Sequence, residues 1–371
     1  MELSSEDSFR LNVLLANKPL AIRIDESRLT VHGLSDRGDA KIQLNPTGRV
    51  ESYLRLVREL ISGQVLGSPG GYPIYLRRWT RMGQMRDESL EQLLLLGEPE
   101  AVVAAVCAPG LTDELARRAW WAMEDADNAR RMLGNPAVRE GQMGRVLAEY
   151  LIEYLPFESE PERAAESVRL CLQPGLLDME RRLDLWKRSG RKPAHQLGFL
   201  MALPDDIPDP EPARRDAADL EALLGPLVAA GDPCAAALGR VLSGPGQTFL
   251  KTLGAFLAKP PTQDLVVAAF DLTRDYFAPL RPEGDPDLTL DALWAEPQTP
   301  LAGPCLALAP ELAAEVTAMR RLSGLGYGVL RGPLLDSTAA GSLMRRKLAP
   351  VLDPVQGQID VLRGRPAGRA G

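Results

Sequence analysis

The first 45 residues carry short apolar runs in a pattern typical of β-strands. Apolar and polar residues partly alternate in residues 21–25, 29–33 and 40–44, and turn-forming residues separate these runs. Residues 11–15 form a similar short run. Alternation with a period of two turns one side of a strand toward a core. The sequence therefore predicts three or four antiparallel strands, the first of them at residues 11–15.

After this region the apolar residues recur at the spacing of helices. They return every three or four positions across residues 50–61, where Gly63 is a candidate stop, and most clearly across residues 144–155. Further helical patterns cover residues 213–230, 233–242, 247–258, 263–277, 309–323 and 343–352. The chain is therefore predicted to be mainly α-helical, with a small antiparallel β region at its start.

Two short motifs each occur twice in the helical part of the sequence. The run that begins at Pro99 resembles the run at Pro136, and residues 109–113 resemble residues 174–178. Proline suits the first turn of a helix, Pro-Gly suits a helix end, and the aspartate that closes each of the second pair is expected to cap the next helix. The two offsets share no single period, so an irregular, HEAT-like stack of helical hairpins is predicted.

Residues 204–212 contain four prolines and four acidic residues, which disfavours both helix and sheet. The predicted organisation is a β-containing region at 1–86, a helical-repeat-like domain at 87–203, a linker at 204–213, and a C-terminal helical domain with a mobile tail at 214–371.

Composition narrows the classes of function. The 371 residues are 45% hydrophobic and 25% charged, with a net charge of −7 and a basic excess confined to residues 1–86. An acidic body argues against general binding to a phosphate backbone, so no DNA partner is expected. The polar, acidic start lacks the features of a signal peptide, and no apolar run approaches the roughly 20 residues that span a bilayer. The expectation is a cytoplasmic protein without a membrane partner.

Residues 68–84 concentrate the side chains best suited to binding. No acidic residue occurs between Glu59 and Asp87. Arginine forks beside aromatic rings suit phosphates, nucleobases or the acidic groups of a partner protein. The predicted binding residues are Tyr72, Tyr75, Arg77, Arg78, Trp79 and Arg81. In the alternative interpretation, the aromatic residues dock the N-terminal region on the helical body while the arginines pair with acids there.

Cys234 is the candidate for thiol chemistry. In the run Asp232-Pro233-Cys234 the aspartate is expected to cap a helix whose second residue is the cysteine. The positive end of a helix favours a thiolate, whereas the aspartate opposes it and the following alanines indicate a packed face. The four cysteines lie far apart in the sequence without a CxxC pair, so no metal site is predicted.

Catalysis by imidazole has few candidates. The chain contains two histidines, His32 and His195, and both are expected to be structural. A Ser-His-Asp or Cys-His site would need one of them, and no nucleophile elbow accompanies either. The sequence therefore predicts no catalytic set and no cofactor.

Several stretches resemble proteins of the DsrS family. The resemblance lies in residues 1–17, 66–84, 108–121, 155–158 and 198–206, and it covers the chain up to about residue 210. Proteins of this family are cytoplasmic and are encoded with the reverse dissimilatory sulfite reductase genes of sulfur-oxidising bacteria. The resemblance implies an accessory or regulatory role in sulfur oxidation, and it assigns no catalytic residue.

Three functions stay open at this point. The favoured one is a non-enzymatic interaction protein that binds a protein of the sulfur-oxidation system through residues 68–84. The second is a post-transcriptional regulator that binds RNA or a nucleotide through the same segment. The third is a sulfur-relay enzyme that uses Cys234.

Overall fold

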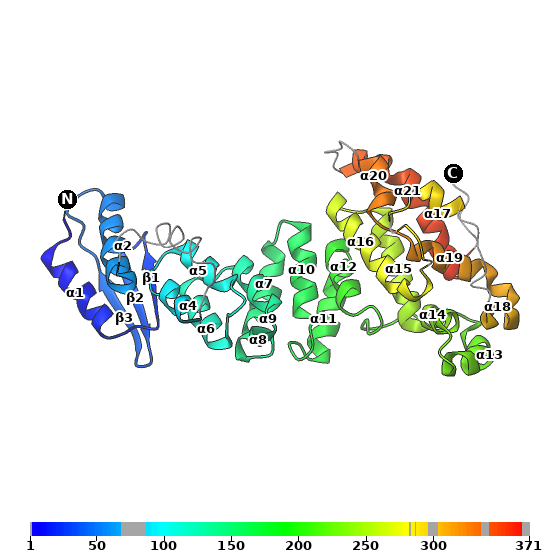
Figure 1. The fold of residues 1–371 in the computed structure, drawn as a ribbon, viewed down its shortest axis with the longest axis horizontal. Helices are drawn as coiled ribbons and strands as arrows, with labels where there is room; N and C mark the ends of the chain where they lie inside the picture. Colours follow the sequence, from blue (N-terminus) through cyan, green and yellow to red (C-terminus); the bar gives the residue numbers. More distant parts are fainter. Residues whose placement is uncertain are drawn as a thin grey trace. The chain divides into compact units, whose positions relative to one another are not determined.

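The computed structural model describes residues 2–67, 87–281, 283–285, 287–295, 303–334 and 341–365. The chain divides into two units, Met1–Tyr154 and Leu155–Gly371, and each is described by itself below (Figure 1). It is mainly helical with a small antiparallel sheet near the N-terminus, as the sequence predicts. Within the described ranges, no helix combines the length and the apolar character needed to cross a membrane. The domain boundaries predicted at residues 86/87 and 204–213 stay predictions.

The N-terminal sheet has three strands in the order β1-β2-β3, all antiparallel. They are β1 (Ala21–Asp25), β2 (Thr30–Ser35) and β3 (Gly38–Gln43). These three predicted strands are confirmed. Because side chains alternate along a strand, the sheet has a core face, which carries Val31, and an opposite face, which carries His32.

The strand predicted at residues 11–15 is wrong, because these residues belong to helix α1 (Ser5–Ala16). The Ser4 side chain caps this helix by accepting the backbone N–H of Asp7 at 3.1 Å. Leu11 and Leu14 lie three positions apart and both face the core. That spacing places both side chains on one face of a helix.

Helix α2 (Val50–Leu66) completes the first core. It runs past the predicted stop at Gly63 and ends at Gly67, whose φ of 66° is the left-handed conformation that glycine adopts readily. The core residues that join α1, the sheet and α2 are Leu11, Leu14, Ile22, Val31, Ile42, Leu44, Tyr53, Leu54, Val57 and Ile61.

Residues 87–154, the described remainder of the first unit, contain six further helices. These helices are α4 (Asp87–Leu94), α5 (Pro99–Val106), α6 (Asp113–Ala122), α7 (Ala126–Gly134), α8 (Pro136–Arg139) and α9 (Gln142–Tyr154). Proline is the first residue of both α5 and α8, as the repeated sequence motif predicts.

The cap predicted for α6 is displaced by one residue. Thr112, rather than Asp113, caps this helix, accepting the N–H of Leu115 at 3.3 Å. The carboxylate of Asp113 instead accepts the N–H groups of Gln142 and Met143, both at 3.0 Å. Asp113 therefore binds the start of α9 and ties two helices together.

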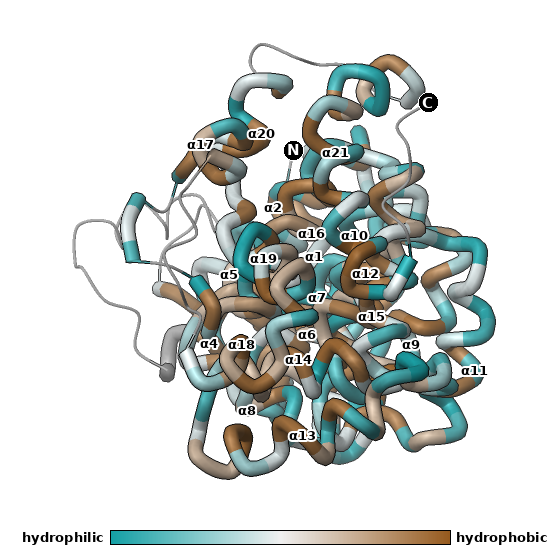
Figure 2. Tube along the Cα trace, turned by 90° about the vertical axis from the view of Figure 1, so that its right-hand side faces the viewer, coloured by the Kyte–Doolittle hydropathy of each residue, from teal (hydrophilic) through white to brown (hydrophobic). Residues whose placement is uncertain are grey.

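The elements described in the second unit are α-helices and short 3-10 helices, the latter labelled η. They are η1 (Leu155–Phe157), α10 (Pro161–Cys171), α11 (Met179–Ser189), α12 (Pro193–Ala202), α13 (Ala217–Ala229), α14 (Pro233–Leu242), α15 (Gly244–Ala258), α16 (Gln263–Tyr276), η2 (Ala278–Leu280), α17 (Leu290–Ala295), α18 (Pro304–Leu308), η3 (Pro310–Leu312), α19 (Ala313–Ser323), α20 (Tyr327–Leu334) and α21 (Gly341–Leu362). Asp178 caps α11 as predicted. Hydrophobic and hydrophilic stretches alternate within many of the helices, as amphipathic packing requires (Figure 2).

Gly198 allows α12 to pack directly on α10. A Cβ atom at this position would lie 2.5 Å from the carbonyl oxygen of Ala165 and 2.8 Å from Cβ of Val168. No other residue fits between these two helices without moving the backbone.

Residues 204–213, which we call the proline segment, form neither helix nor strand, as predicted. Arg240 of α14 forms a two-pronged salt bridge with Asp205, with both N···O distances 2.6 Å. The N–H of Glu211 donates to Thr248 Oγ1 at 2.7 Å. The proline segment is therefore fastened along the helices of the second unit.

Two side chains from earlier parts of the second unit approach the carbonyl of Leu362, at the end of α21. The Gln247 side chain donates to this oxygen at 3.3 Å, and Nη1 of Arg214 approaches it at 3.5 Å. The Arg214 guanidinium also bonds Glu315 at 2.9 Å and Asp216 at 2.7 Å. A mostly buried arginine thus links the start of α13 to α19 and to the end of α21.

Candidate functional site

The six binding residues predicted from residues 68–84 lie outside the described residues. These residues are Tyr72, Tyr75, Arg77, Arg78, Trp79 and Arg81. Their role stays a prediction.

The sheet of the first unit carries a row of basic side chains on its non-core face. Arg23 of β1 pairs with His32 of β2, and His32 pairs with Lys41 of β3. Lys41 is exposed, and the other two are half-buried. We call these three residues the basic row. The register that sets this row follows from the two tight strand connections, so it is a fixed feature of the sheet.

Trp121 of α6 holds one end of the basic row. The guanidinium carbon of Arg23 lies 5.0 Å from the centre of the Trp121 ring, and Nη1 of Arg23 donates to the Trp121 carbonyl at 3.1 Å. The indole N–H donates to Asp39 at 3.1 Å. These contacts order the arginine and the ring before a ligand binds, which lowers the entropic cost of binding.

The basic row lowers the pKa of its central histidine. Partial burial has the largest effect on His32, followed by the neighbouring charges of Arg23 and Lys41. The carboxylates of Asp25 and Asp39 act in the opposite direction. Both carboxylates already accept hydrogen bonds, Asp25 from Ser27 and Arg28 and Asp39 from Trp121. An anion placed over the row would stabilise the imidazolium form.

A cleft of about 530 Å³ lies beside the hairpin that β2 and β3 form. It lies between the end of α1 and the β2–β3 connection, and its lining includes Leu14, Lys18, Gly33, Asp36 and Arg37. Its mixed charges and open form give it no evident preference for one ligand class. Together with the basic row, however, it places four lysine or arginine side chains around one small sheet.

The thiol site predicted at Cys234 forms the local structure that the sequence indicates. Asp232 caps α14 by accepting the N–H of Ala235 through Oδ1 at 2.8 Å. Pro233 and Cys234 are the first two residues of that helix. The capping argument from the sequence is therefore confirmed.

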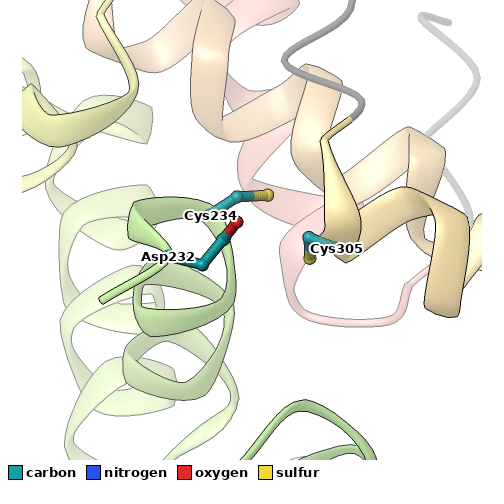
Figure 3. A group of neighbouring side chains, drawn as sticks. All are labelled: Asp232, Cys234 and Cys305. Carbon is teal, nitrogen blue, oxygen red and sulfur yellow. The ribbon is translucent and has the colours of Figure 1, made fainter. Parts of the chain in front are cut away.

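The structure adds a second thiol that sequence reasoning missed. Cys305, at the start of α18, brings its sulfur beside Cys234 (Figure 3). The two sulfur atoms and a carboxylate oxygen of Asp232 all lie within 4.8 Å of one another. Cys234 is 2% exposed and Cys305 is fully buried. No local pattern predicts this pairing, because the two cysteines are far apart in the sequence and only tertiary packing joins them.

Burial raises the pKa of both thiols in this pair. The neighbouring Cys305 thiol and the Asp232 carboxylate raise the pKa of Cys234 further. Burial is also the first cause of the raised pKa of Cys305. Both groups are therefore protonated at neutral pH, which opposes the reactive thiolate that a helix N-terminus would otherwise favour.

His195 and Cys171 are both buried in the second unit. Burial in α12 lowers the pKa of His195 to about 4, so its imidazole is neutral at physiological pH. Burial raises the pKa of Cys171 to about 12. Cys107 is exposed at the end of α5.

The chain was compared with protein-family models, curated proteins and solved structures, and none of them matches it. The resemblance to the DsrS family therefore rests on the sequence motifs alone.

Proposed function

We propose that this chain is a non-enzymatic accessory or regulatory protein of cytoplasmic sulfur oxidation that binds an acidic surface of a partner protein. The observation that supports a binding role is the basic row, Arg23, His32 and Lys41, with Trp121 at its border. The DsrS resemblance supplies the sulfur-oxidation context. The row and the predicted segment 68–84 both belong to the basic first 86 residues.

The dimensions of the basic row suit carboxylate side chains of a protein. Adjacent strands lie about 4.8 Å apart, so the three side chains cover roughly 10 Å. Neighbouring acidic residues on a helix or a strand repeat at a similar spacing. Arginine and tryptophan are also the residues that most often dominate the binding energy of protein interfaces.

The charge balance favours a protein over RNA. The basic row holds two permanent positive charges among acidic neighbours, and the whole chain carries −7. RNA binding gains from many phosphate contacts and the release of their counterions. An RNA ligand is therefore the alternative that the experiment below must distinguish.

The protonated state of Cys234 weighs against the sulfur-relay alternative. A relay needs a thiolate that attacks a sulfur donor and releases its product to an acceptor. Cys234 is buried and its pKa is raised. Both observations disfavour a sulfur relay at Cys234.

The experiment is affinity isolation from sulfur-grown cells, followed by titration of the purified partner. The test variant is Arg23→Gln with Lys41→Gln. The control variant is Arg55→Gln with Arg188→Gln, which removes two exposed charges from α2 and α11. We expect the test variant to lose at least about tenfold in affinity, as the loss of about 1.4 kcal/mol would give, and the control to bind as the wild type does.

Equal binding by the test variant and the wild type would contradict the role of the basic row. Recovery of RNA, with a binding constant that falls steeply with salt, would instead support the second function. A separate variant with Arg77, Arg78 and Arg81 changed to Gln tests the predicted segment independently.

A further inference from the structure

We propose that Asp232, Cys234 and Cys305 bind a thiophilic d10 metal ion, Zn²⁺ or Cu⁺. Among the described residues, these three form the one group of three or more cysteine, histidine or acidic side chains whose ligand atoms converge closely enough to hold an ion. Two thiolates and one carboxylate are a donor set that both ions accept.

The geometry of the donors is close to that of a bound ion. Zinc–sulfur bonds of about 2.3 Å in a tetrahedral site separate two sulfur ligands by roughly 3.8 Å. The three donor atoms here lie within 4.8 Å of one another. The donors therefore have to approach by at most about 1 Å to hold the ion.

One carboxylate oxygen of Asp232 is available to bind the ion. Its Oδ1 accepts the N–H of Ala235, while Oδ2 has no hydrogen-bond partner among the described residues. The helix cap thus fixes the orientation of the carboxylate, as outer contacts usually do for metal ligands. Asp232 is also the partly exposed member of the group and provides the route from solvent.

The electrostatics of the bound form are favourable. Two thiolates and one carboxylate around Zn²⁺ carry a net charge of −1, and the positive end of the ten-residue helix α14 faces this charge. An ordinary cysteine thiol has a pKa of about 8.5, so both thiols carry a proton at neutral pH before an ion binds. Binding of Zn²⁺ therefore forms two metal–sulfur bonds, breaks two S–H bonds and releases two protons to solvent, with no change of oxidation state.

The placement of the ligands gives the ion a structural effect. Cys234 lies on α14 and Cys305 on the separate short helix α18. An ion between them would fasten α18 to the start of α14. Metal binding is therefore expected to stabilise the folded chain, by an amount that rises with the logarithm of the free ion concentration.

The test uses the full chain, reduced and handled without oxygen, with Zn²⁺ and Cu⁺ added in separate titrations against a chromogenic competitor. The variants are Cys234→Ala, Cys305→Ala and Asp232→Asn. Asparagine keeps the helix cap and removes the anionic ligand. Cys107→Ser and Cys171→Ala are the matched controls, one for an exposed thiol and one for a buried thiol.

We expect one ion per wild-type chain, release of two protons per Zn²⁺, and a metal-dependent rise in Tm. Each cysteine variant is expected to lose at least 100-fold in affinity and the Tm rise, and Asp232→Asn to lose about tenfold. The two controls should bind as the wild type does. The two titrations show which of the two ions the site binds more tightly.

The site is refuted if the wild-type chain binds neither ion more tightly than the double variant Cys234→Ala, Cys305→Ala. Loss of binding in Cys107→Ser together with full binding in Cys234→Ala would refute it equally. The unfolding curve of each variant without metal shows whether it folds, so a folding defect is separable from a binding defect.

Discussion

The Tyr53 hydroxyl donates a 2.5 Å hydrogen bond to the carboxylate of Asp7, which is fully buried and lies 46 residues earlier in the chain. The same oxygen, Oδ2, accepts the backbone N–H of Asn45 at 2.8 Å. This contact ties α1, α2 and the end of the strand β3 together around a buried acid.

Removing the Tyr53 hydroxyl is expected to destabilise the first unit. Oδ1 of Asp7 has no hydrogen-bond partner among the described residues. Of the two donors to Oδ2, Tyr53→Phe removes the hydroxyl and leaves the N–H of Asn45. We expect a loss of about 1 to 3 kcal/mol in the free energy of unfolding, measured in urea. Tyr150→Phe is the control, because its hydroxyl bonds no described residue, and it should change stability by less than about 0.5 kcal/mol. Equal effects of the two variants would show that the Asp7 contact contributes nothing.

Two glycines on helices should respond in opposite ways to alanine. Gly198→Ala places a methyl group 2.5 Å from the Ala165 carbonyl oxygen and should cost about 1 to 3 kcal/mol through overpacking. A methyl group at Gly239, within α14, would meet nothing within 4 Å, so Gly239→Ala should stabilise by about 0.5 to 1 kcal/mol. Thermal unfolding of both variants measures the difference. A neutral Gly198→Ala would mean that α10 and α12 separate easily.

His195 should make the second unit sensitive to mild acid. Burial lowers the pKa of its imidazole from 6.5 to about 4, with a smaller effect from Lys192. Because the folded state disfavours the proton, the contribution to stability is present above pH 6.5 and is lost as the pH falls toward 4. The loss amounts to roughly 2 to 3 kcal/mol. Urea unfolding between pH 7 and pH 4 should show this slope in the wild type and a flatter one in His195→Gln; parallel slopes would exclude the histidine as the cause.

Protease should detect whether the proline segment is fastened in solution. Arg240 bonds Asp205 through two nitrogens, bonds the carbonyl of Tyr276 at 2.6 Å, and stacks 3.5 Å above the Tyr276 ring. Arg240→Gln removes these contacts together, so cleavage within residues 204–213 is expected to become several-fold faster under native conditions. Arg188→Gln, on α11, is the control and should leave the cleavage rate unchanged. Rapid cleavage of the wild type would contradict the fastened segment.

Local signals in the sequence were sufficient for most elements of the fold. Proline at first helical turns, the cap at Asp232 and three of the strands follow from rules that involve neighbouring residues only. The error at residues 11–15 has the same origin, because five residues are too few to separate a helical repeat from strand alternation. The helix was recognisable only from the spacing of Leu11 and Leu14 together with the cap at Ser4.

The candidate sites depended on contacts between distant residues. The basic row needs the register of three strands, and Trp121 joins it from α6, so their sequence positions give no hint of one surface. Cys305 reaches Cys234 only through the packing of the second unit. The binding segment 68–84, the sequence feature that carried the first hypothesis, remains a prediction.

The Leu362 carbonyl has a consequence for how the chain folds during synthesis. It accepts a hydrogen bond from Gln247, which leaves the ribosome 115 residues earlier, and it approaches Arg214, which emerges earlier still. The first unit has its own core, and its residues precede all of these. Folding during translation is therefore expected to be sequential, with the second unit left open, and exposed to chaperones and proteases, until α21 has emerged.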